Sequence, residues 1–349
     1  MSNEKLNVGV IGVGSVSSYR HFPQYIEYPR SHLYAICDND PLWLPDAKEL
    51  YKPEKAFLDY HEMLADPKLD AVSICLPTVL HAQATIDAMK AGKHVLCEKP
   101  MAISATEAYE MKKVSETTGK KLMISQNQRL EDNVQYIKRL ADEGFFGNIY
   151  LIRLGWRRPL GGLPPNIASR PNGQTYNRNS YNEKDRGGGV LRDLGSHLLD
   201  LSMYITGFPN LRDVVSSLYR KFYPDDYEPG KYICDAEDMA VSQMVFDSGL
   251  TIQLEVSFGS YVAEELVFTE IYGTKGGASR RNSALKLISF KDGKTVIDPV
   301  EKYDVETKQT THCFVDAILD GTDIPIPASE GVKIIEILDA IYKSAGEIK

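Results

Sequence analysis

The sequence predicts an α/β fold in which an N-terminal doubly wound parallel sheet precedes an α+β domain with a large, mostly antiparallel open sheet. Two observations predict it. In the first third of the chain, short apolar runs alternate with segments that have helical spacing. In the remainder, runs of alternating apolar and polar residues follow one another across short turns. Because 349 residues are too many for one ordinary core, we expect two domains, at residues 1–126 and 127–349, with the late helices as candidates to pack back on the first.

The first third contains five short runs rich in apolar and β-branched residues. They predict strands within residues 7–14, 32–40, 69–78, 94–100 and 121–129. Residues 79–92 and 104–119 have helical spacing between these runs, and each of the two segments ends in a glycine, a common helix stop. Strands that alternate with helices at this cadence indicate right-handed βαβ crossovers and a parallel sheet covered on both faces.

From about residue 125 the pattern changes. A helix near 130–143 leads to a strand at 148–158 and then to a polar stretch, 159–186, that is longer than a connector needs. A helix near 190–206 precedes further strand-like runs, and two late helices close the chain. The predicted strands lie at 213–222, 238–246, 250–258, 265–273 and 284–290, and the late helices at 309–320 and 330–346. Short turns at 247–249 and 291–294 favour antiparallel pairing.

Composition excludes several classes of protein. The formal charge of −8, without a long Lys/Arg run, argues against nucleic acid or an anionic membrane surface as the main partner. No apolar run approaches the roughly 18 residues of a membrane span, and no signal segment is seen, so we expect a cytoplasmic protein. The five cysteines include no CxxC pair and are expected to be reduced.

A glycine motif, Gly12-x-Gly14-x-x-Ser17, follows the first predicted strand. In a dinucleotide-binding Rossmann fold, Gly12 makes the tight turn and Gly14 lets the backbone approach a pyrophosphate at the helix N-terminus, where Ser15 and Val16 lie. Ser17 replaces the third glycine of the strict pattern. By itself the motif is a weak signal, because a plain tight strand-to-helix turn has the same pattern.

Asp38 strengthens the dinucleotide interpretation. It lies at the end of the second predicted strand, 24 residues beyond Gly14, where a carboxylate accepts hydrogen bonds from ribose hydroxyls. The neighbouring Asn39 and Asp40 offer no arginine for a 2′-phosphate. We therefore expect NAD as the cofactor in preference to NADP.

The segment "HVLCEKP" (94–100) places a lysine directly after an apolar run. Burying an ammonium is costly unless it is paired or needed. Lys99 is therefore either at a surface strand end or placed there for chemistry. In parallel sheets, ligands bind outside the carboxyl ends of the strands, which is where Lys99 is expected.

The segment "RGGGVLRDLGSHLLD" (186–200) contains Asp193 and His197 four residues apart, with Asp200 one turn further. On a helix, the first two lie on one face, where a carboxylate can orient an imidazole as a general base. The alternative is a packed histidine beside surface acids. Asp193, His197 and Asp200 are also possible zinc ligands, but no cysteine or second histidine lies nearby in sequence, so no metal is expected.

Taken in order, the motifs "GVGSVS", "LPTVLH", "EKP" and "GGGVLRDLGSHLLD" resemble the Gfo/Idh/MocA family, the group of glucose-fructose oxidoreductase and inositol dehydrogenase. The resemblance covers nearly the full length. It implies catalytic roles for Lys99, Asp193 and His197, and a cis bond before Pro100. The expected cofactor-binding residues are Gly12, Gly14, Ser15, Val16, Asp38, Pro77, Thr78, His81, Glu98, Lys99 and Gln126.

A mixture of aromatic and polar side chains in or beside the long polar stretch is able to stack on a sugar ring and bond its hydroxyls. The expected substrate-binding residues are Lys99, Arg129, Trp156, Arg157, Tyr181, Asp193 and His197. The resemblance implies hydride transfer between NAD and a secondary ring hydroxyl of a sugar or glycoside, with position 3 as the first guess and inositol as the closest alternative. Either His197, with Lys99 stabilising the alkoxide, or Lys99 itself accepts the proton.

Two other classes stay open. One is a regulatory protein that binds NAD or NADP without turnover, and the other is an enzyme that retains NAD and uses it transiently. The second domain is expected to bind substrate and to join subunits, as a homodimer or homotetramer, because an open sheet leaves a face to protect. The alternating residues 250–258 and 265–273 are candidates for that surface.

Overall fold

The computed structural model describes residues 5–160, 167–169, 175–177, 183–222 and 234–346; for 167–169 and 175–177 it describes the backbone alone. The chain divides into two compact units. The first comprises Met1–Gln126, Asn166–Arg178 and Lys308–Ile335, and the second comprises Asn127–Pro165, Asn179–Thr307 and Glu336–Lys349.

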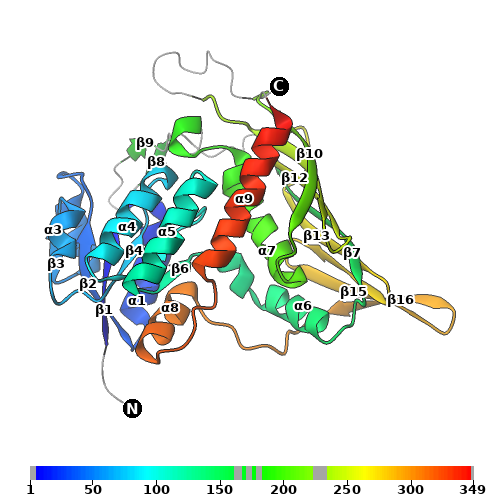
Figure 1. Cartoon of the computed structure of the whole chain (residues 1–349), viewed down its shortest axis with the longest axis horizontal. Helices are drawn as coiled ribbons and strands as arrows, with labels where there is room; N and C mark the ends of the chain where they lie inside the picture. Colours follow the sequence, from blue (N-terminus) through cyan, green and yellow to red (C-terminus); the bar gives the residue numbers. More distant parts are fainter. Residues whose placement is uncertain (1–4, 161–166, 170–174, 178–182, 223–233, 347–349) are drawn as a thin grey trace. The chain divides into compact units, whose positions relative to one another are not determined.

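A six-stranded parallel sheet forms the centre of the first unit (Figure 1). Its strands are β1 (Leu6–Ile11), β2 (Ser31–Cys37), β3 (Lys55–Phe57), β4 (Ala71–Ile74), β5 (His94–Cys97) and β6 (Leu122–Ile124). The order is β3-β2-β1-β4-β5-β6, and every pairing is parallel. The strand order therefore reverses between β1 and β4, the point at which such sheets bind ligands. This confirms the predicted doubly wound sheet.

The helices of this unit are α1 (Phe22–Glu27), α2 (Leu44–Tyr51), α3 (Tyr60–Leu64), α4 (His81–Lys90), α5 (Ala105–Thr118) and α8 (Thr310–Leu319). A π-helical turn, Ser17–His21, leads directly into α1. The cap of α5 follows from its sequence, because Ser104 Oγ accepts the Glu107 amide at 3.3 Å and Gly119 ends the helix with φ +67°.

The late helix α8 packs on the first unit, against α1 and the start of β2. The Tyr28 hydroxyl donates to Asp316 at 2.5 Å, and the Tyr28 and His312 rings stack at 4.0 Å. Arg30 forms ion pairs with Asp316 and Asp320. The last helix, α9 (Ala328–Ala345), begins in the first unit and ends in the second.

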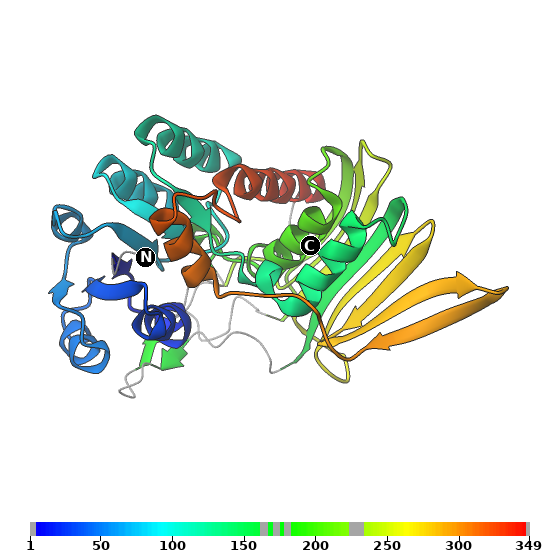
Figure 2. The ribbon, with the colours of Figure 1, turned by 90° about the horizontal axis from the view of Figure 1, so that it is seen from below.

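An eight-stranded sheet forms the second unit (Figure 2). Its strands are β7 (Ile149–Pro159), β10 (Leu211–Tyr219), β11 (Met239–Phe246), β12 (Thr251–Ser260), β13 (Leu266–Gly273), β14 (Gly276–Arg281), β15 (Ala284–Lys291) and β16 (Lys294–Val300). The order is β10-β11-β12-β7-β13-β14-β15-β16, and only the central β12–β7 pair is parallel. This confirms the predicted mostly antiparallel sheet.

The helices α6 (Asp132–Asp142) and α7 (Ser196–Thr206) lie on one face of this sheet. Alternate residues of β12, among them Ile252, Leu254 and Val256, are fully or almost fully buried beneath that layer. The apolar face of residues 250–258 is thus part of the core, so the expectation that it serves as a subunit surface is wrong.

The structure departs from the predicted elements at several positions. Strands β3, β14 and β16 were not predicted, and the polar stretch 159–186 contains two short paired strands, β8 (Ile167–Ser169) and β9 (Thr175–Asn177). The helix predicted near 190–206 begins with a π-helical turn, Leu191–Gly195, before α7. No helix in the described part of the chain is long and apolar enough to cross a membrane.

Candidate active site

The carboxyl ends of five parallel strands gather most of the predicted cofactor-binding residues at one edge of the first sheet. Gly12 and Gly14 follow β1, Asp38 follows β2, and Gln126 follows β6. The other members of this edge, after β4 and β5, are Pro77, Thr78, Glu98 and Lys99. Because all strands of the sheet run the same way, these residues lie together although they are far apart in sequence.

The turn after β1 accepts only glycine at its first position. Gly12 has φ +93°, and a β-carbon built there would lie 2.5 Å from the carbonyl oxygen of Cys75. The turn is also tied from both sides, because the Val13 amide donates to Asp38 Oδ2 at 2.8 Å and Trp43 Nε1 donates to the Val13 carbonyl at 2.9 Å. The fully buried Trp43 thus fixes the loop.

The Asp38 carboxylate holds this turn and is still able to accept further hydrogen bonds. Its Oδ1 accepts the Asp40 amide at 3.0 Å, and its Oδ2 accepts the Val13 amide. Each carboxylate oxygen has two lone pairs, so both are able to accept one more hydrogen bond from a ribose hydroxyl. The half-buried Gly14, Ser15 and Val16 follow at the start of the first helix.

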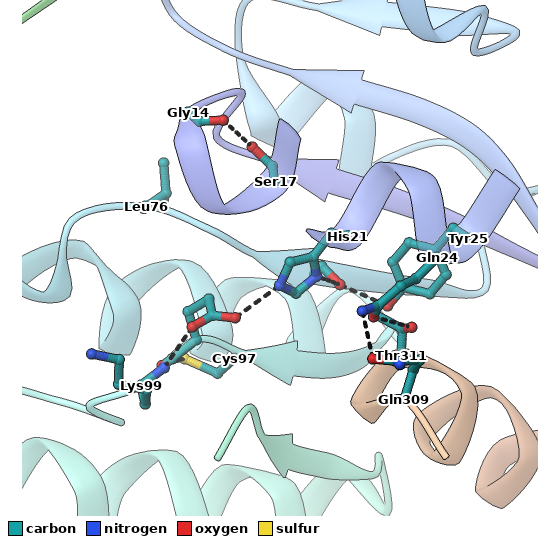
Figure 3. A network of polar contacts seen from close by, with 12 residues as sticks. Gly14, Ser17, His21, Gln24, Tyr25, Leu76, Cys97, Lys99, Gln309 and Thr311 are labelled. Carbon is teal, nitrogen blue, oxygen red and sulfur yellow. Dashed lines mark hydrogen bonds and ion pairs between the residues drawn. The ribbon is translucent and has the colours of Figure 1, made fainter. Parts of the chain in front are cut away.

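Glu98 and Lys99 extend from the end of β5. The carboxylate of Glu98 is buried and accepts from His21 Nε2 at 2.8 Å and from the Lys99 amide at 3.2 Å (Figure 3). Burial by itself raises the pKa of Glu98, but the hydrogen bond and charge of His21 outweigh it and lower that pKa to about 2. Lys99 is half-buried, and its bond to Pro100 is cis, as the resemblance implied.

His81 is placed behind this edge. It is almost fully buried, with Nδ1 at 2.9 Å from the Pro100 carbonyl and Nε2 at 2.8 Å from the Leu76 carbonyl. Burial lowers the pKa of His81 against the raising effect of these two acceptors. His81 therefore ties the loop after β4 to the loop after β5.

Gln126 provides a test of whether the edge fits a polar cofactor. Its side chain is 2% exposed, and its Oε1 has no hydrogen-bond partner within the described residues. A buried polar atom without a partner is costly, so it is expected to meet a donor from a ligand. Together with the glycine turn and Asp38, this orphaned acceptor fits an amide-bearing dinucleotide.

In the second unit, Trp156 and His197 come together. Trp156 lies on the helix-covered face of β7, and its ring centroid is 6.3 Å from that of His197 in the first turn of α7. The Trp156 indole donates to Glu265 at 2.7 Å, and Arg158 lies over its ring at 5.1 Å. His197 is 9% exposed, and Asp193 is half-buried in the π-helical turn that leads into α7.

Two predicted substrate-binding residues are not brought together with this pair. Arg157 points to the opposite face of β7 from Trp156, where it pairs with Glu255 at 3.0 Å. Arg129 is fully buried in a two-point ion pair with Asp200, and the Tyr204 ring covers its guanidinium at 4.8 Å. Tyr181 lies outside the described residues.

Glu237 is a buried residue near this site that the sequence reasoning missed. It lies just before β11, is 2% exposed, and accepts from the Leu191 amide at 3.0 Å and the Tyr342 hydroxyl at 2.8 Å. Its own carbonyl accepts the Val190 amide at 3.1 Å. Glu237 thus anchors the start of the helix that carries Asp193 and His197. The signal available in the sequence was a pair of acids opening a buried strand.

Among the described residues, no group of three or more His, Cys, Asp or Glu side chains is arranged to hold a metal ion. Asp200, one of the three residues considered as ligands, is committed to Arg129.

Comparison with known proteins extends these observations. Residues 6–126 match the family model described as "Oxidoreductase family, NAD-binding Rossmann fold", and residues 134–279 match the one described as "GFO/IDH/MocA C-terminal domain". Together the two matches cover well over half of the chain.

Several relatives share this similarity at low identity. The chain is 26% identical to D-glucoside 3-dehydrogenase of Escherichia coli, over 99% of this chain and 97% of that protein. It is 31% identical to myo-inositol 2-dehydrogenase of Thermotoga maritima, over 58% of this chain and 55% of that protein. Among solved structures, levoglucosan dehydrogenase in complex with NADH superposes with a TM-score of 0.84 at 22% identity, covering 98% of this chain and 97% of that one.

Proposed function

Because the chain belongs to the GFO/IDH/MocA family of oxidoreductases with an NAD-binding Rossmann fold, we propose that it oxidises a secondary ring hydroxyl of a sugar or glycoside with NAD. The observation that carries this proposal is Lys99 at the carboxyl end of β5, on the same sheet edge as the glycine turn and Asp38. A protein that only bound NAD would need the turn and the acid but no lysine there.

Within the proposal, Gly12, Gly14, Ser15, Val16 and Asp38 hold the pyrophosphate and the adenosine ribose. A further group faces the remainder of NAD, namely Pro77, Thr78, Glu98, Lys99 and Gln126. His81 acts behind them by joining two loops. NAD is preferred to NADP because the Asp38 carboxylate repels a 2′-phosphate.

The proposed oxidation needs one acceptor for a hydride and another for a proton. NAD, when bound, supplies a nicotinamide ring that takes the carbon-bound hydrogen together with its electron pair. His197 takes the hydroxyl proton, oriented by Asp193, and Lys99 donates a hydrogen bond to the same oxygen and stabilises its developing negative charge. The alcohol becomes a ketone. The alternative assignment, with Lys99 as base, predicts a different pH dependence.

The position of the Trp156 indole favours a ring-shaped substrate. Its indole is held by Glu265 and flanked by Arg158, and its plane lies near His197. An aromatic face of this kind stacks on the apolar face of a sugar ring while nearby polar groups bond the hydroxyls. We therefore propose Trp156, Asp193 and His197 as substrate-binding residues in this unit.

The relatives suggest which rings to try. One is named a D-glucoside 3-dehydrogenase, which favours position 3 of a glycoside, and another a myo-inositol 2-dehydrogenase, which favours a cyclic polyol. NADH formation should be followed with methyl glucosides, free hexoses, levoglucosan and inositols, with NAD and NADP tested separately. NADH formation with one of these substrate classes supports the proposal and identifies the ring.

Failure of that panel points to the other classes. Tight NAD binding without turnover of any sugar or polyol would contradict the dehydrogenase and favour a regulatory protein. Sugar products that form without net NADH would favour an enzyme that retains its cofactor.

We also propose that a second copy of the chain covers the face of the large sheet away from α6 and α7. Among the described residues, large apolar side chains are exposed on this open face at Val215, Val241, Phe290 and Ile297. The strand registers and alternation place them opposite the buried Ile252 and Leu254. Light scattering after gel filtration should give a dimer or tetramer, and Val215→Asp together with Phe290→Asp should give the monomer.

A further inference from the structure

His21 and Glu98 form a buried, hydrogen-bonded pair behind the end of β5. The imidazole of His21 is fully buried, its Nε2 lies 2.8 Å from Glu98 Oε1, and the two residues are 77 positions apart in sequence (Figure 3). A buried carboxylate is strongly unfavourable unless it is paired and hydrogen-bonded. The contact with His21 is therefore needed to keep the Glu98 carboxylate in the interior of the first unit.

The other nitrogen of His21 is held as well. Its Nδ1 lies 3.2 Å from Ser73 Oγ, and that hydroxyl is 2.7 Å from the Tyr25 hydroxyl. These contacts fix the plane of the imidazole. Glu98 is ionised, so Nε2 is the nitrogen that carries a proton toward it.

The second carboxylate oxygen of Glu98 contacts the backbone of Lys99. Glu98 Oε2 accepts the Lys99 amide at 3.2 Å, while Oε1 is held by His21. Rotation of the Glu98 carboxylate would break both contacts at once. The direction in which the chain leaves β5 at Lys99 therefore depends on His21, a residue of another element.

The π-helical turn explains how His21 comes to this position. His21 is the last residue of the turn Ser17–His21, in which the Phe22 amide bonds to the Ser17 carbonyl five residues back. The turn contains one more residue than an α-helical turn. It therefore changes the direction in which the following side chains point. The same helix begins at the glycine turn, which links the cofactor-binding loop to the position of Lys99.

We propose that His21 is a positioning residue that holds Lys99 in its working orientation through Glu98. Its effect on turnover rests on the proposed function, in which Lys99 contacts the reacting oxygen. Its effect on the Lys99 backbone does not.

The first test compares two amide substitutions of similar size. In His21→Gln the amide nitrogen replaces Nε2 and keeps a donor for Glu98, whereas in His21→Asn it replaces Nδ1 and keeps only the contact with Ser73. Hydrogen exchange of the Lys99 amide should be read in both, with Tyr25→Phe as the control that alters the same network without touching Glu98. We expect His21→Asn to accelerate exchange at Lys99 by about tenfold or more, and the other two variants to leave it nearly unchanged.

Equal exchange at Lys99 in all three folded variants would overturn the proposal. If His21→Asn does not fold, Glu98→Gln replaces it, because the amide loses the negative charge and its nitrogen repels one of the two donors, His21 Nε2 or the Lys99 amide. The same acceleration at Lys99 is then expected, and unchanged exchange would again contradict it.

The second test is a double-substitution cycle on turnover with the substrate found by the panel. His21→Asn should lower kcat about tenfold while the Kd for NADH stays nearly unchanged, and it should cause no further loss in a Lys99→Ala background. An equal additional loss in that background would indicate a general structural effect and contradict positioning through Lys99. If Lys99→Ala itself keeps full turnover, the proposed role of Lys99 fails, while the exchange result still decides the role of His21.

Discussion

Gly189 lies directly against the buried carboxylate of Glu237. A β-carbon built on Gly189 would be 2.2 Å from Glu237 Oε1, and the glycine has φ +111°, a conformation that other residues rarely adopt. The carboxylate also accepts the Leu191 amide and the Tyr342 hydroxyl. The start of the helix that bears Asp193 and His197 is thus fixed by a contact that only a glycine permits.

Gly189→Ala should therefore displace Glu237 and lower both stability and turnover. We expect a loss of about 2–4 kcal/mol in the free energy of unfolding, from the strained φ and the displaced carboxylate. Urea denaturation measures it. The control is Gly207→Ala, which has φ +76° but nothing within 4 Å of its β-carbon, and should cost only about 1 kcal/mol. Equal losses in the two variants would show that the contact with Glu237 is unimportant.

The ion pair between Arg129 and Asp200 gives a second prediction. Both side chains are at most 2% exposed, so removing one leaves the other charged and buried. Arg129→Met should lower the free energy of unfolding by about 3–5 kcal/mol, and Arg129→Met with Asp200→Leu should recover most of it. If Arg129→Met instead keeps full stability and weakens substrate binding, Arg129 has the substrate-binding role that its sequence position suggested.

Stability should fall in mild acid because of His94. Burial, followed by the charges of Lys120 and Lys121, lowers the pKa of His94 to about 4, although Asp70 acts in the opposite direction. Its Nδ1 also accepts the Lys121 amide at 3.0 Å, which requires the neutral ring. Since the folded pKa is below the ordinary value, stability is full above about pH 6.5 and is lost as the pH falls toward 4.

We expect this histidine to contribute about 1–2 kcal/mol to the difference in unfolding free energy between pH 7 and pH 4.5, after allowance for solvent screening. His94→Gln, which keeps an acceptor, should reduce the difference by that amount. His61→Gln changes an exposed histidine, with 62% of its side chain accessible, and serves as the control. An undiminished difference in His94→Gln would show that other groups are responsible.

Asp38 should set the choice between NAD and NADP. Asp38→Asn keeps an acceptor for the Val13 amide but loses the negative charge. We expect the Kd for NADH to rise about tenfold or more and the preference over NADPH to shrink. Fluorescence titration of both nucleotides measures this, with the exposed Glu49→Gln as a control for net charge. An unchanged ratio of the two Kd values would exclude a role for Asp38 in the preference.

The sequence predicted those parts of the fold that have strong local patterns. Strands β1, β2, β4 and β5 are mostly apolar runs, each followed within three residues by a glycine, a proline or a charged residue, and α5 has a cap at each end. Strands β3, β14 and β16 carry no such pattern. Their sequences are KAF, GGASRR and KTVIDPV, and neighbouring strands hold them in place through the ladder.

The same limit applies to the site. The glycine turn, Asp38, Lys99 and His197 were found because each lies at a recognisable position in its own segment. The partners that hold them were not found. Glu237 lies 46 residues from Leu191, and His21 lies 77 residues from Glu98. The π-helical turns at Ser17–His21 and Leu191–Gly195 also shift side-chain directions by one residue, which helical periodicity does not predict.

The proposed role of Lys99 in an NAD-dependent oxidation is open to a single decisive comparison of two lysine variants. NADH formation should be compared between the wild-type protein and Lys99→Met, with NADH binding followed in parallel and the exposed Lys90→Met as control. We expect Lys99→Met to bind NADH nearly normally and to lose turnover by about a hundredfold or more, whereas Lys90→Met keeps its turnover. Undiminished turnover in a folded Lys99→Met protein would contradict a catalytic role for Lys99.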